Sequence, residues 1–278
     1  TGRFSSQYPN LQQVPARDPE LGPMIRSLFI PEEDSEWYCA DYSQQEPRVL
    51  IHYACLKDMS SALKVQKEFC RNDKTDFHQM VANMAGIERK QAKTINLGLF
   101  YGMGNKKLAA QLGLEQDQAY ELFNQYHNKV PFVRELSRQV SHIAGSRGYI
   151  KTLLGRKRRF DLWEPRDSWG ERAYSLSEAY SHYPKQELKR AYTHTALNAL
   201  IQGSSADITK SAMIKIYEAG LLDEIDLKLT IHDELDFSIP RNKQKCFEEA
   251  LQIMKTCVKL KVPLKVDVEK GDNWGNAK

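Results

Sequence analysis

The sequence predicts an α+β fold, and three features support that prediction. Residues 227–239 alternate apolar and polar side chains on both sides of a short centre, as the strands of a β-hairpin do. Residues 37–40 form a short aromatic run that is typical of a buried strand, and a helix start follows it. Residues 50–145 and 191–219 are dominated by helical spacing. At 278 residues, the chain is long enough for one large domain or two smaller ones.

The tip of the expected hairpin holds acids in place of the usual turn formers. Residues 231–235 contain neither Gly nor Asn-Gly, and Asp233 and Glu234 are adjacent there. Two carboxylates ~4 Å apart repel each other by roughly 4 kcal/mol at an effective dielectric constant of about 20. A nearby cation would remove that cost. From the hairpin alone, a solvated acidic turn is the alternative, because short motifs also match by chance.

A second acid, Asp41, has a similar setting. It follows the aromatic run 37–40 and precedes Pro47, which fits the first turn of a helix because no N–H is needed there. Asp41 is therefore expected where a strand ends and a helix begins. Taken alone, it is better explained as a helix cap. Paired with Asp233, it predicts two carboxylates at strand ends that share divalent metal ions.

Composition narrows the class of protein. The hydrophobic content of 41% is sufficient for a core, and the net charge of +4 is compatible with a nucleic-acid partner. The five cysteines include no C-x-x-C pair, which indicates a reducing compartment and argues against a structural zinc site. No run of eighteen apolar residues and no signal peptide is found, so we expect a cytoplasmic protein without membrane contact. Because the chain begins at Thr1, we expect a fragment or a processed piece.

The first third of the chain is expected to contain loops, one strand and several helices. Residues 1–30 are rich in loops, with a strand expected at residues 24–30. The helices of residues 50–85 break at the polar residues 72–74, and Asp76 is expected to cap the helix that follows.

The middle of the chain is helical and then basic. Pro131 interrupts the helical run 105–145. Residues 147–159 are densely basic and begin with a strand-like stretch, 149–154, so they either bind phosphates or form a solvated charge run. No function follows from the polar and aromatic residues 161–189.

Residues 88–104 predict a helix with a stripe along one face that changes from cationic to apolar to aromatic. Arg89, Lys93, Leu97 and Tyr101 recur at four-residue steps, which place them along one slowly drifting stripe. Cations suit a triphosphate and an aromatic ring suits a base. Gly98 costs about 1 kcal/mol relative to Ala inside a helix, which is explained if something approaches the backbone closely. An amphipathic helix with solvated cations is the alternative.

The long helix expected after residue 190 carries another polar stripe. His194, Asn198 and Gln202 recur at four-residue spacing, and such side chains hydrogen-bond base edges, sugars or a neighbouring strand. A helix at 244–259 and a strand with alternation at 264–268 are expected to close the chain.

Four motifs, in this order, resemble the polymerase domain of family A DNA polymerases. The motifs are DYSQQEPR from Asp41, RKQAKTINLGLFYG from Arg89, NALIQGSSAD from Asn198 and IHDE from Ile231. Each is moderately specific, and four in the right order are highly specific. The resemblance extends from Thr1-Gly2-Arg3 to Trp274, and the first motif is closer to phage members than to bacterial enzymes.

The resemblance implies a right-hand polymerase fold, with a palm of antiparallel sheet and helical fingers. The thumb and any 3′–5′ exonuclease of the family precede the Thr-Gly-Arg segment, so we expect the thumb to be absent and duplex DNA to be held weakly. The implied domains are the first part of the palm at 1–75, the fingers at 76–190 (with the nucleotide-binding helix 88–102, the basic segment 147–159 and the polar insertion 161–189), and the second part of the palm at 191–278.

The implied activity is DNA-directed DNA synthesis, in replication of a phage or in repair. Two Mg²⁺ ions, with Mn²⁺ as a substitute, would be held by Asp41, Asp233 and the backbone carbonyl of Tyr42, because hard oxygen ligands suit Mg²⁺. Lys93 and Arg89 would hold the triphosphate, and Lys93 would also protonate the leaving group.

The resemblance assigns further contacts residue by residue. The nucleotide-binding residues would include His78, Gln44, Leu97, Tyr101 and the sugar gate Glu46. The primer–template contacts would be Arg3, Gln12, Arg17, Gly98, Asn198, Gln202, His232 and Glu234. The implied partners are primer–template DNA, deoxyribonucleoside triphosphates, an upstream thumb or exonuclease region in the same or another chain and, as a candidate, a processivity factor.

Two positions depart from the family pattern. Leu97 stands where an aromatic ring usually lies against the sugar, so selection against dideoxynucleotides and turnover are expected to differ. Gln45 replaces the commoner apolar residue beside the gate, so fidelity does not follow from the resemblance.

Three hypotheses remain open from the sequence. The first is a DNA polymerase core. The second is a relative of single-subunit RNA polymerases, against which Glu46 and Glu234 argue, because a sugar gate excludes ribonucleotides. The third is a nucleic-acid-binding fragment that is inert until a thumb-bearing chain joins it.

Overall fold

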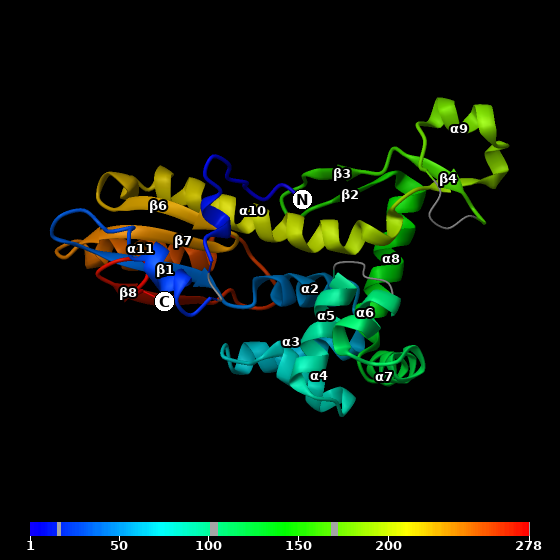
Figure 1. Ribbon diagram of the computed structural model, residues 1–278, viewed down its shortest axis with the longest axis horizontal. Coiled ribbons are helices and arrows are strands. Elements are labelled where there is room, and N and C mark those ends of the chain that lie inside the picture. The colour runs from blue at the N-terminus through cyan, green and yellow to red at the C-terminus, as the bar shows by residue number, and fades with distance from the viewer. Residues whose placement is uncertain (16–17, 101–104, 168–171, 278) are drawn as a thin grey trace. The chain divides into compact units, whose positions relative to one another are not determined.

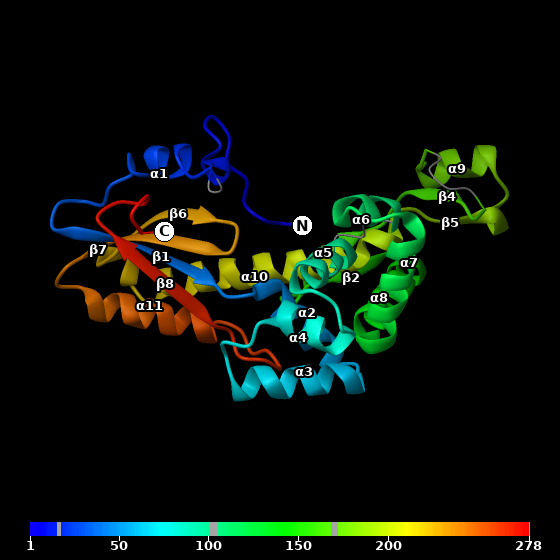
Figure 2. The same ribbon diagram turned by 60° about the horizontal axis from the view of Figure 1, so that its bottom comes forward.

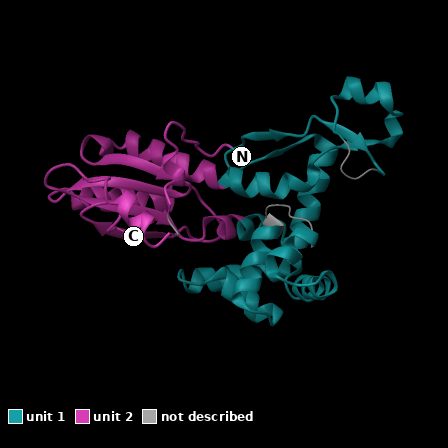
Figure 3. Cartoon of the chain, viewed as in Figure 1, with its two compact units in different colours: residues 1, 50–204 teal, residues 2–49, 205–278 magenta. Residues whose placement is uncertain are grey.

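The computed structural model describes residues 1–15, 18–100, 105–167 and 172–277, and its ribbon is drawn in Figures 1 and 2. The chain separates into two compact units, coloured in Figure 3. One unit contains Gly2–Val49 and Ser205–Lys278, and we call it the sheet unit. The other contains Thr1 and Leu50–Ser204, and we call it the helical unit. These boundaries differ from the functional domains expected at 75/76 and 190/191, which stay a prediction.

A four-stranded antiparallel sheet forms the centre of the sheet unit. Its strand order is β6-β7-β1-β8. The strands are β1 (Ser35–Tyr42), β6 (Asp226–Ile231), β7 (Glu234–Pro240) and β8 (Val266–Gly271). The hairpin expected at 227–239 is therefore confirmed as β6 and β7, with a register shift between Leu227 and Leu229.

At the central strands β1 and β7, both faces of the sheet are covered, because alternate side chains enter two different clusters. On one face, Tyr38 and Phe237 pack against Phe247 of α11 (Gln244–Thr256), with ring centroids 4.6 and 5.7 Å away. On the other face, Trp37 stacks near Trp274 at 6.4 Å. Every residue of β7 except the last is buried, so the outward alternation seen in its sequence does not mean exposure to solvent.

The strand expected at residues 24–30 is wrong. The structure has a short helix there, α1 (Leu21–Arg26), and Leu28 is 77% exposed. The side chain of Asp18 accepts hydrogen bonds from the backbone N–H groups of Glu20 and Leu21, which begins the helix. Within the segment, Arg26 is buried with its guanidinium 4.5 Å from the Trp274 ring centroid, and Phe29 meets Trp274 edge-on at 5.3 Å.

The helical unit is built from consecutive helices and two small hairpins. Pro131 begins α8 rather than merely ending the preceding helix. The helices are α3 (Ser60–Arg71), α4 (Phe77–Ala85), α5 (Arg89–Phe100), α6 (Asn105–Leu112), α7 (Gln116–Lys129), α8 (Pro131–Arg147) and α9 (Leu176–His182). The hairpins pair β2 (Tyr149–Lys151) with β3 (Lys157–Arg159), and β4 (Trp163–Pro165) with β5 (Leu188–Arg190).

Two helices contain the boundaries between the units. They are α2 (Gln45–Cys55) and α10 (Ala196–Glu218). The long helix expected from residue 191 begins five residues later, because a 3₁₀ turn, Thr193–Thr195, precedes it. His194 therefore lies outside the helix that carries Asn198 and Gln202. The helix expected at 244–259 likewise ends early, at Thr256.

The five cysteines are free thiols. Within the described ranges, the chain has no helix with the length and apolar composition that a bilayer span requires.

Candidate active site

The two acids predicted to hold metal ions lie at the ends of neighbouring strands of the sheet unit, Asp41 near the end of β1 and Asp233 in the turn before β7. Asp41 is the penultimate residue of β1 and stands opposite Glu234, the first residue of β7. Asp233 precedes that residue, and its backbone carbonyl accepts a hydrogen bond of 3.3 Å from the N–H of Tyr42. The fold thus brings together residues that are almost 200 positions apart in the sequence.

A third strand adds an acid that the sequence reasoning missed. Asp267 of β8 stands opposite Asp41, so a row of carboxylates crosses the sheet from Glu234 through Asp41 to Asp267. Directly opposed side chains lie on the same face of an antiparallel sheet, and like charges in such positions destabilise it. The alternation of β8 marked Asp267 as polar, but only the register of the sheet places it beside Asp41.

Two residues further along the same face, Cys39 of β1 stands opposite Asp236 of β7. A thiol and two carboxylates, from Cys39, Glu234 and Asp236, lie with one ligand atom each within 4.8 Å of one another, and all three residues are buried. Their presence extends the acidic character of this sheet face beyond the strand ends.

Burial is the dominant influence on Asp233. It raises the pKa of this carboxyl above its ordinary value, Arg3 and His232 oppose the rise, and Glu234 adds to it. On Asp267, burial also raises the pKa, but hydrogen bonds from Lys265 (2.6 Å) and Ser43 outweigh it and hold the pKa below its usual range. Carboxylate oxygens suit a hard divalent cation such as Mg²⁺, but among the described residues the metal-sized group is Cys39, Glu234 and Asp236, which includes a thiol and leaves out Asp41 and Asp233.

The side chain of Tyr42 lies in the core. Its hydroxyl donates to the backbone carbonyl of Met254 at 2.8 Å and lies 3.6 Å from the Cys257 sulfur, inside the core. Burial raises the pKa of Tyr42 above its ordinary value, so the phenol stays protonated. The Tyr42 side chain is thus engaged in the core, and the metal contact expected from its backbone carbonyl stays a prediction.

Other predicted residues of the sheet unit surround these strand ends. Arg3 forms an ion pair with Glu46, so a predicted primer–template contact and the predicted sugar gate meet each other. Gln12 donates to the backbone carbonyl of Thr230 on β6 at 3.1 Å. His232 is exposed at the hairpin tip with φ 59°, a left-handed conformation.

Two glutamines lie at the start of α2. Gln44 takes a left-handed conformation, φ 52°, immediately before the helix. Gln45, the departure beside the gate, is buried and donates to the Thr209 hydroxyl at 3.4 Å. Its amide therefore has a partner inside the sheet unit.

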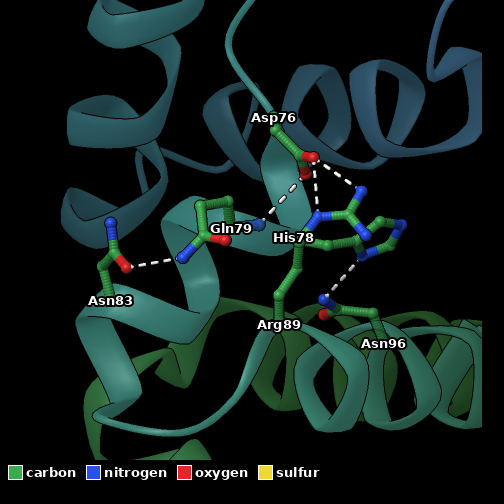
Figure 4. Close-up of polar contacts among 6 residues, drawn as sticks. All are labelled: Asp76, His78, Gln79, Asn83, Arg89 and Asn96. Atoms are coloured by element: carbon green, nitrogen blue, oxygen red, sulfur yellow. Dashed lines mark hydrogen bonds and ion pairs between the residues drawn. The ribbon is translucent and has the colours of Figure 1, made fainter.

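The predicted triphosphate-binding residues belong to α4 and α5 of the helical unit, and Figure 4 draws two of them, His78 and Arg89. As expected, Asp76 caps α4, accepting from the N–H of Gln79 at 3.0 Å. Its other carboxylate oxygen accepts from Arg89 Nε and Nη2 at 2.9 and 2.7 Å. Arg89 is thereby held beside His78, with the exposed Lys93 one turn further along α5.

His78 is neutral in this setting. Its pKa is lowered to about 4, mainly by burial; the charge of Asp76 opposes this effect, and the positive charges of Lys93 and Arg89 add to it. The neutral His78 therefore lies within electrostatic reach of Arg89 and Lys93, the two cations of the predicted four-residue stripe.

Gly98 has a packing explanation. A Cβ at this position would lie 2.7 Å from Cδ1 of Leu108 in α6, and Leu108 is buried. The close approach expected at Gly98 is therefore made, in this structure, by a side chain of the neighbouring helix. Leu97 is half-buried on α5. Tyr101 and Arg17 lie outside the described residues.

The start of α10 and the basic hairpin belong together in the helical unit. Arg156 donates to the carbonyl of Gly203 at 3.0 Å, next to Gln202. Asn198 has a buried side-chain oxygen without a hydrogen-bond partner among the described residues. Both predicted primer–template residues of α10 are half-buried, and the β2–β3 hairpin places Lys151 opposite Lys157.

Comparison with known proteins identifies the family of this chain. The family model described as DNA polymerase family A matches residues 1–276. The DNA-directed DNA polymerase of Pseudomonas phage M6 is 40% identical over 317 residues, covering 99% of this chain and 43% of that protein. DNA polymerase I of Rhizobium leguminosarum is 33% identical, covering 100% of this chain and 26% of that protein. DNA polymerase DpoZ of Salmonella phage PMBT28 is 30% identical, with coverage of 100% and 44%.

A solved structure is similar throughout the chain. It is the POL domain of Pol1 from M. smegmatis, in complex with DNA primer-template and dNTP, with a TM-score of 0.80 and 32% identity. The similarity covers 99% of this chain and 46% of that one, so the chain spans less than half the length of each relative named here. With a family match over nearly every residue and paired acids at neighbouring strand ends, the chain belongs to DNA polymerase family A.

Proposed function

We propose that this chain is the catalytic core of a DNA-directed DNA polymerase, which adds deoxyribonucleotides to a primer 3′-OH under the direction of a template. The observation that carries the proposal is the placement of Asp41 and Asp233 at the ends of neighbouring strands, in a chain that matches the family from residue 1 to residue 276. The sheet unit then corresponds to the palm and the helices of the helical unit to the fingers.

In this proposal, the sheet unit holds the metal ions. Asp41, Asp233 and the Tyr42 carbonyl are the ligands, and the Glu234–Asp41–Asp267 row supplies the negative field that attracts divalent cations. Two bound Mg²⁺ ions would stabilise the attacking and leaving oxygens of the phosphoryl transfer. Glu46, kept in place by Arg3, is the residue that excludes a 2′-hydroxyl.

The helical unit binds the incoming triphosphate. Arg89 and Lys93 neutralise its negative charge, and His78 donates a hydrogen bond to a phosphate oxygen. Arg89 is held by Asp76 in the structure, so the phosphates meet a guanidinium whose position is already restricted. Such restriction reduces the conformational entropy lost when the nucleotide binds.

Primer extension with Mg²⁺ and deoxyribonucleotides tests the proposal. We expect Asp233→Asn to reduce extension by at least ~100-fold, because the metal site loses a charged ligand at the reacting centre. Primer–template affinity should change by less than about twofold. Asp226→Asn is the matched control, since Asp226 begins the same hairpin at its far end and is exposed.

Near-normal extension by Asp233→Asn would refute the metal assignment. If the 278-residue chain shows no activity, the same variants are compared in a chimaera. In it, the chain replaces the matching 43% of the Pseudomonas phage M6 polymerase. A chimaera that binds primer–template but remains inactive with Asp41 and Asp233 intact would favour the non-catalytic alternative.

A further inference from the structure

Three residues from three helices form a buried hydrogen-bonded chain behind His78. Asn96 of α5 lies 3.1 Å from His78 through its Nδ2 and the ring Nδ1, as Figure 4 shows. The hydroxyl of Tyr126, from α7, donates to Asn96 Oδ1 at 2.5 Å. Asn96 and Tyr126 are both 0% exposed, so water does not compete for these groups.

The orientation of the Asn96 amide follows from the need of Tyr126 for an acceptor. Burial raises the pKa of Tyr126 above its ordinary value, so the phenol keeps its proton. Among the described residues, Asn96 Oδ1 is the acceptor within reach of that proton. If the amide were turned, its Nδ2 would face the phenol and the buried O–H would have no acceptor, which is a costly arrangement. The Nδ2 of Asn96 therefore faces His78.

The state of His78 then follows from Asn96. An amide N–H that donates to Nδ1 requires a lone pair there, so the single ring proton of a neutral histidine resides on Nε2. A protonated ring would bring an N–H against the Asn96 amide and add a third positive charge beside Lys93 and Arg89. The lowered pKa of His78, about 4, agrees with a neutral ring at neutral pH.

We propose that Asn96 and Tyr126 are positioning residues that fix His78 as the Nε2–H tautomer, so that its ring donates one directed hydrogen bond to a phosphate oxygen of the incoming nucleotide. The phosphate contact rests on the proposed function, whereas the tautomer does not. Arg89 and Lys93 neutralise the charge of the phosphates, and the fixed imidazole adds a hydrogen bond of defined direction. A third cation at the same place would add charge without that defined direction.

The first measurement is the ¹⁵N chemical shift of the His78 ring in the protein without nucleotide, assigned with a His78→Gln variant. We expect a single neutral tautomer with the proton on Nε2. In Tyr126→Phe, which keeps the buried ring, Asn96 loses the group that orients it, and we expect a mixture of both tautomers. Tyr120→Phe is the matched control on the same helix, because Tyr120 is 61% exposed, and it should behave as the unmodified chain.

The second measurement is nucleotide use, with the chain or the chimaera described above. We expect Tyr126→Phe to raise KM for the deoxyribonucleotide by about 3- to 10-fold, the equivalent of one hydrogen bond. The kcat should change by less than about twofold, because His78 contacts bound nucleotide before and during the reaction. Tyr120→Phe should leave both constants unchanged.

A His78→Ala background separates positioning from general packing. If Asn96 and Tyr126 act through His78, Tyr126→Phe should have no further effect on KM in that background. The positioning role is overturned if Tyr126→Phe raises KM equally with and without His78, or if the unmodified chain shows the Nδ1–H tautomer. If instead the Nε2–H tautomer is found but His78→Ala leaves KM unchanged, the proposed nucleotide contact is refuted and the positioning of the ring stands.

Discussion

Asp76 serves two neighbours with its two carboxylate oxygens. One oxygen accepts from the N–H of Gln79 and caps α4, and the other accepts from Arg89. Burial raises the pKa of Asp76, but the cap and the guanidinium outweigh it and hold the pKa below its usual value. A single residue therefore both begins a helix and restricts a cation that we propose to bind triphosphate.

Two substitutions separate these roles. Asp76→Asn keeps a good cap and removes the charge, so it should lower the free energy of unfolding by less than ~1 kcal/mol, since the ion pair is partly exposed. Asp76→Ala removes the cap as well and should cost about 1 kcal/mol more. Urea unfolding of both variants measures the difference, and equal losses would mean that the cap contributes nothing.

The lowered pKa of His78 predicts that the free energy of unfolding depends on pH. Its pKa is about 4 in the folded chain and about 6.5 when unfolded, so below pH 6.5 the unfolded state binds the proton more readily. The resulting stability is present above pH 6.5 and is lost as the pH falls towards 4. We expect a loss of about 2 kcal/mol between pH 7 and pH 5.

Urea unfolding at the two pH values checks this expectation. In His78→Gln the loss attributable to this residue should disappear, whereas His142→Gln, at an exposed position of α8, should retain it. An identical pH dependence in both variants would contradict the lowered pKa of His78.

At the scale of the element, some features of α5 follow from its own sequence, whereas others depend on the helices that pack against it. Its periodicity predicted the helix and the face that carries Arg89 and Lys93, because four-residue spacing is a local property of the chain. The same periodicity did not predict that Leu108 of α6 would lie against Gly98, nor that Tyr126 of α7 would lie against Asn96. Those contacts depend on how three helices pack.

Gly98→Ala should therefore destabilise the helical unit. A Cβ placed 2.7 Å from buried Leu108 should cost about 1–3 kcal/mol, which exceeds the gain of about 1 kcal/mol in helix propensity. In a Leu108→Ala background the sign should reverse, because the obstructing side chain is gone.

Gly145→Ala in α8 is the matched control for this substitution. A Cβ at Gly145 meets nothing within 4 Å, so the free energy of unfolding should rise by up to about 1 kcal/mol. Chemical denaturation measures all three changes. A stabilising Gly98→Ala in the unmodified background would show that α6 yields without cost.

At the scale of the whole molecule, the polymerase proposal predicts a choice of sugar. Glu46, restrained by Arg3, is expected to reject a 2′-hydroxyl, so deoxyribonucleotides should be incorporated at least ~100-fold more efficiently than ribonucleotides. Competition at equal concentrations measures the ratio, and a preference for ribonucleotides would favour the RNA polymerase alternative. Glu46→Ala should reduce the ratio, whereas Glu68→Ala on the exposed face of α3 should not.

Local patterns in the chain were enough to predict the α+β class, the β6–β7 hairpin, the cap at Asp76 and four motifs in the order of the family. Alternation, helical spacing and capping depend on residues close in sequence, and motifs are read directly. The wrong strand at residues 24–30 shows the limit of such reasoning, because an apolar run does not reveal whether a neighbouring strand exists to pair with it.

The remaining features depended on strand register and helix packing. The register of β1 with β7 and β8 put Asp267 beside Asp41, and helix packing brought Tyr126 to Asn96 and Asn96 to His78. These partners are separated by 18 to more than 200 residues, and each pairing is set by the burial of many other side chains. A local pattern identifies which residues carry chemistry, whereas long-range packing determines which of them meet.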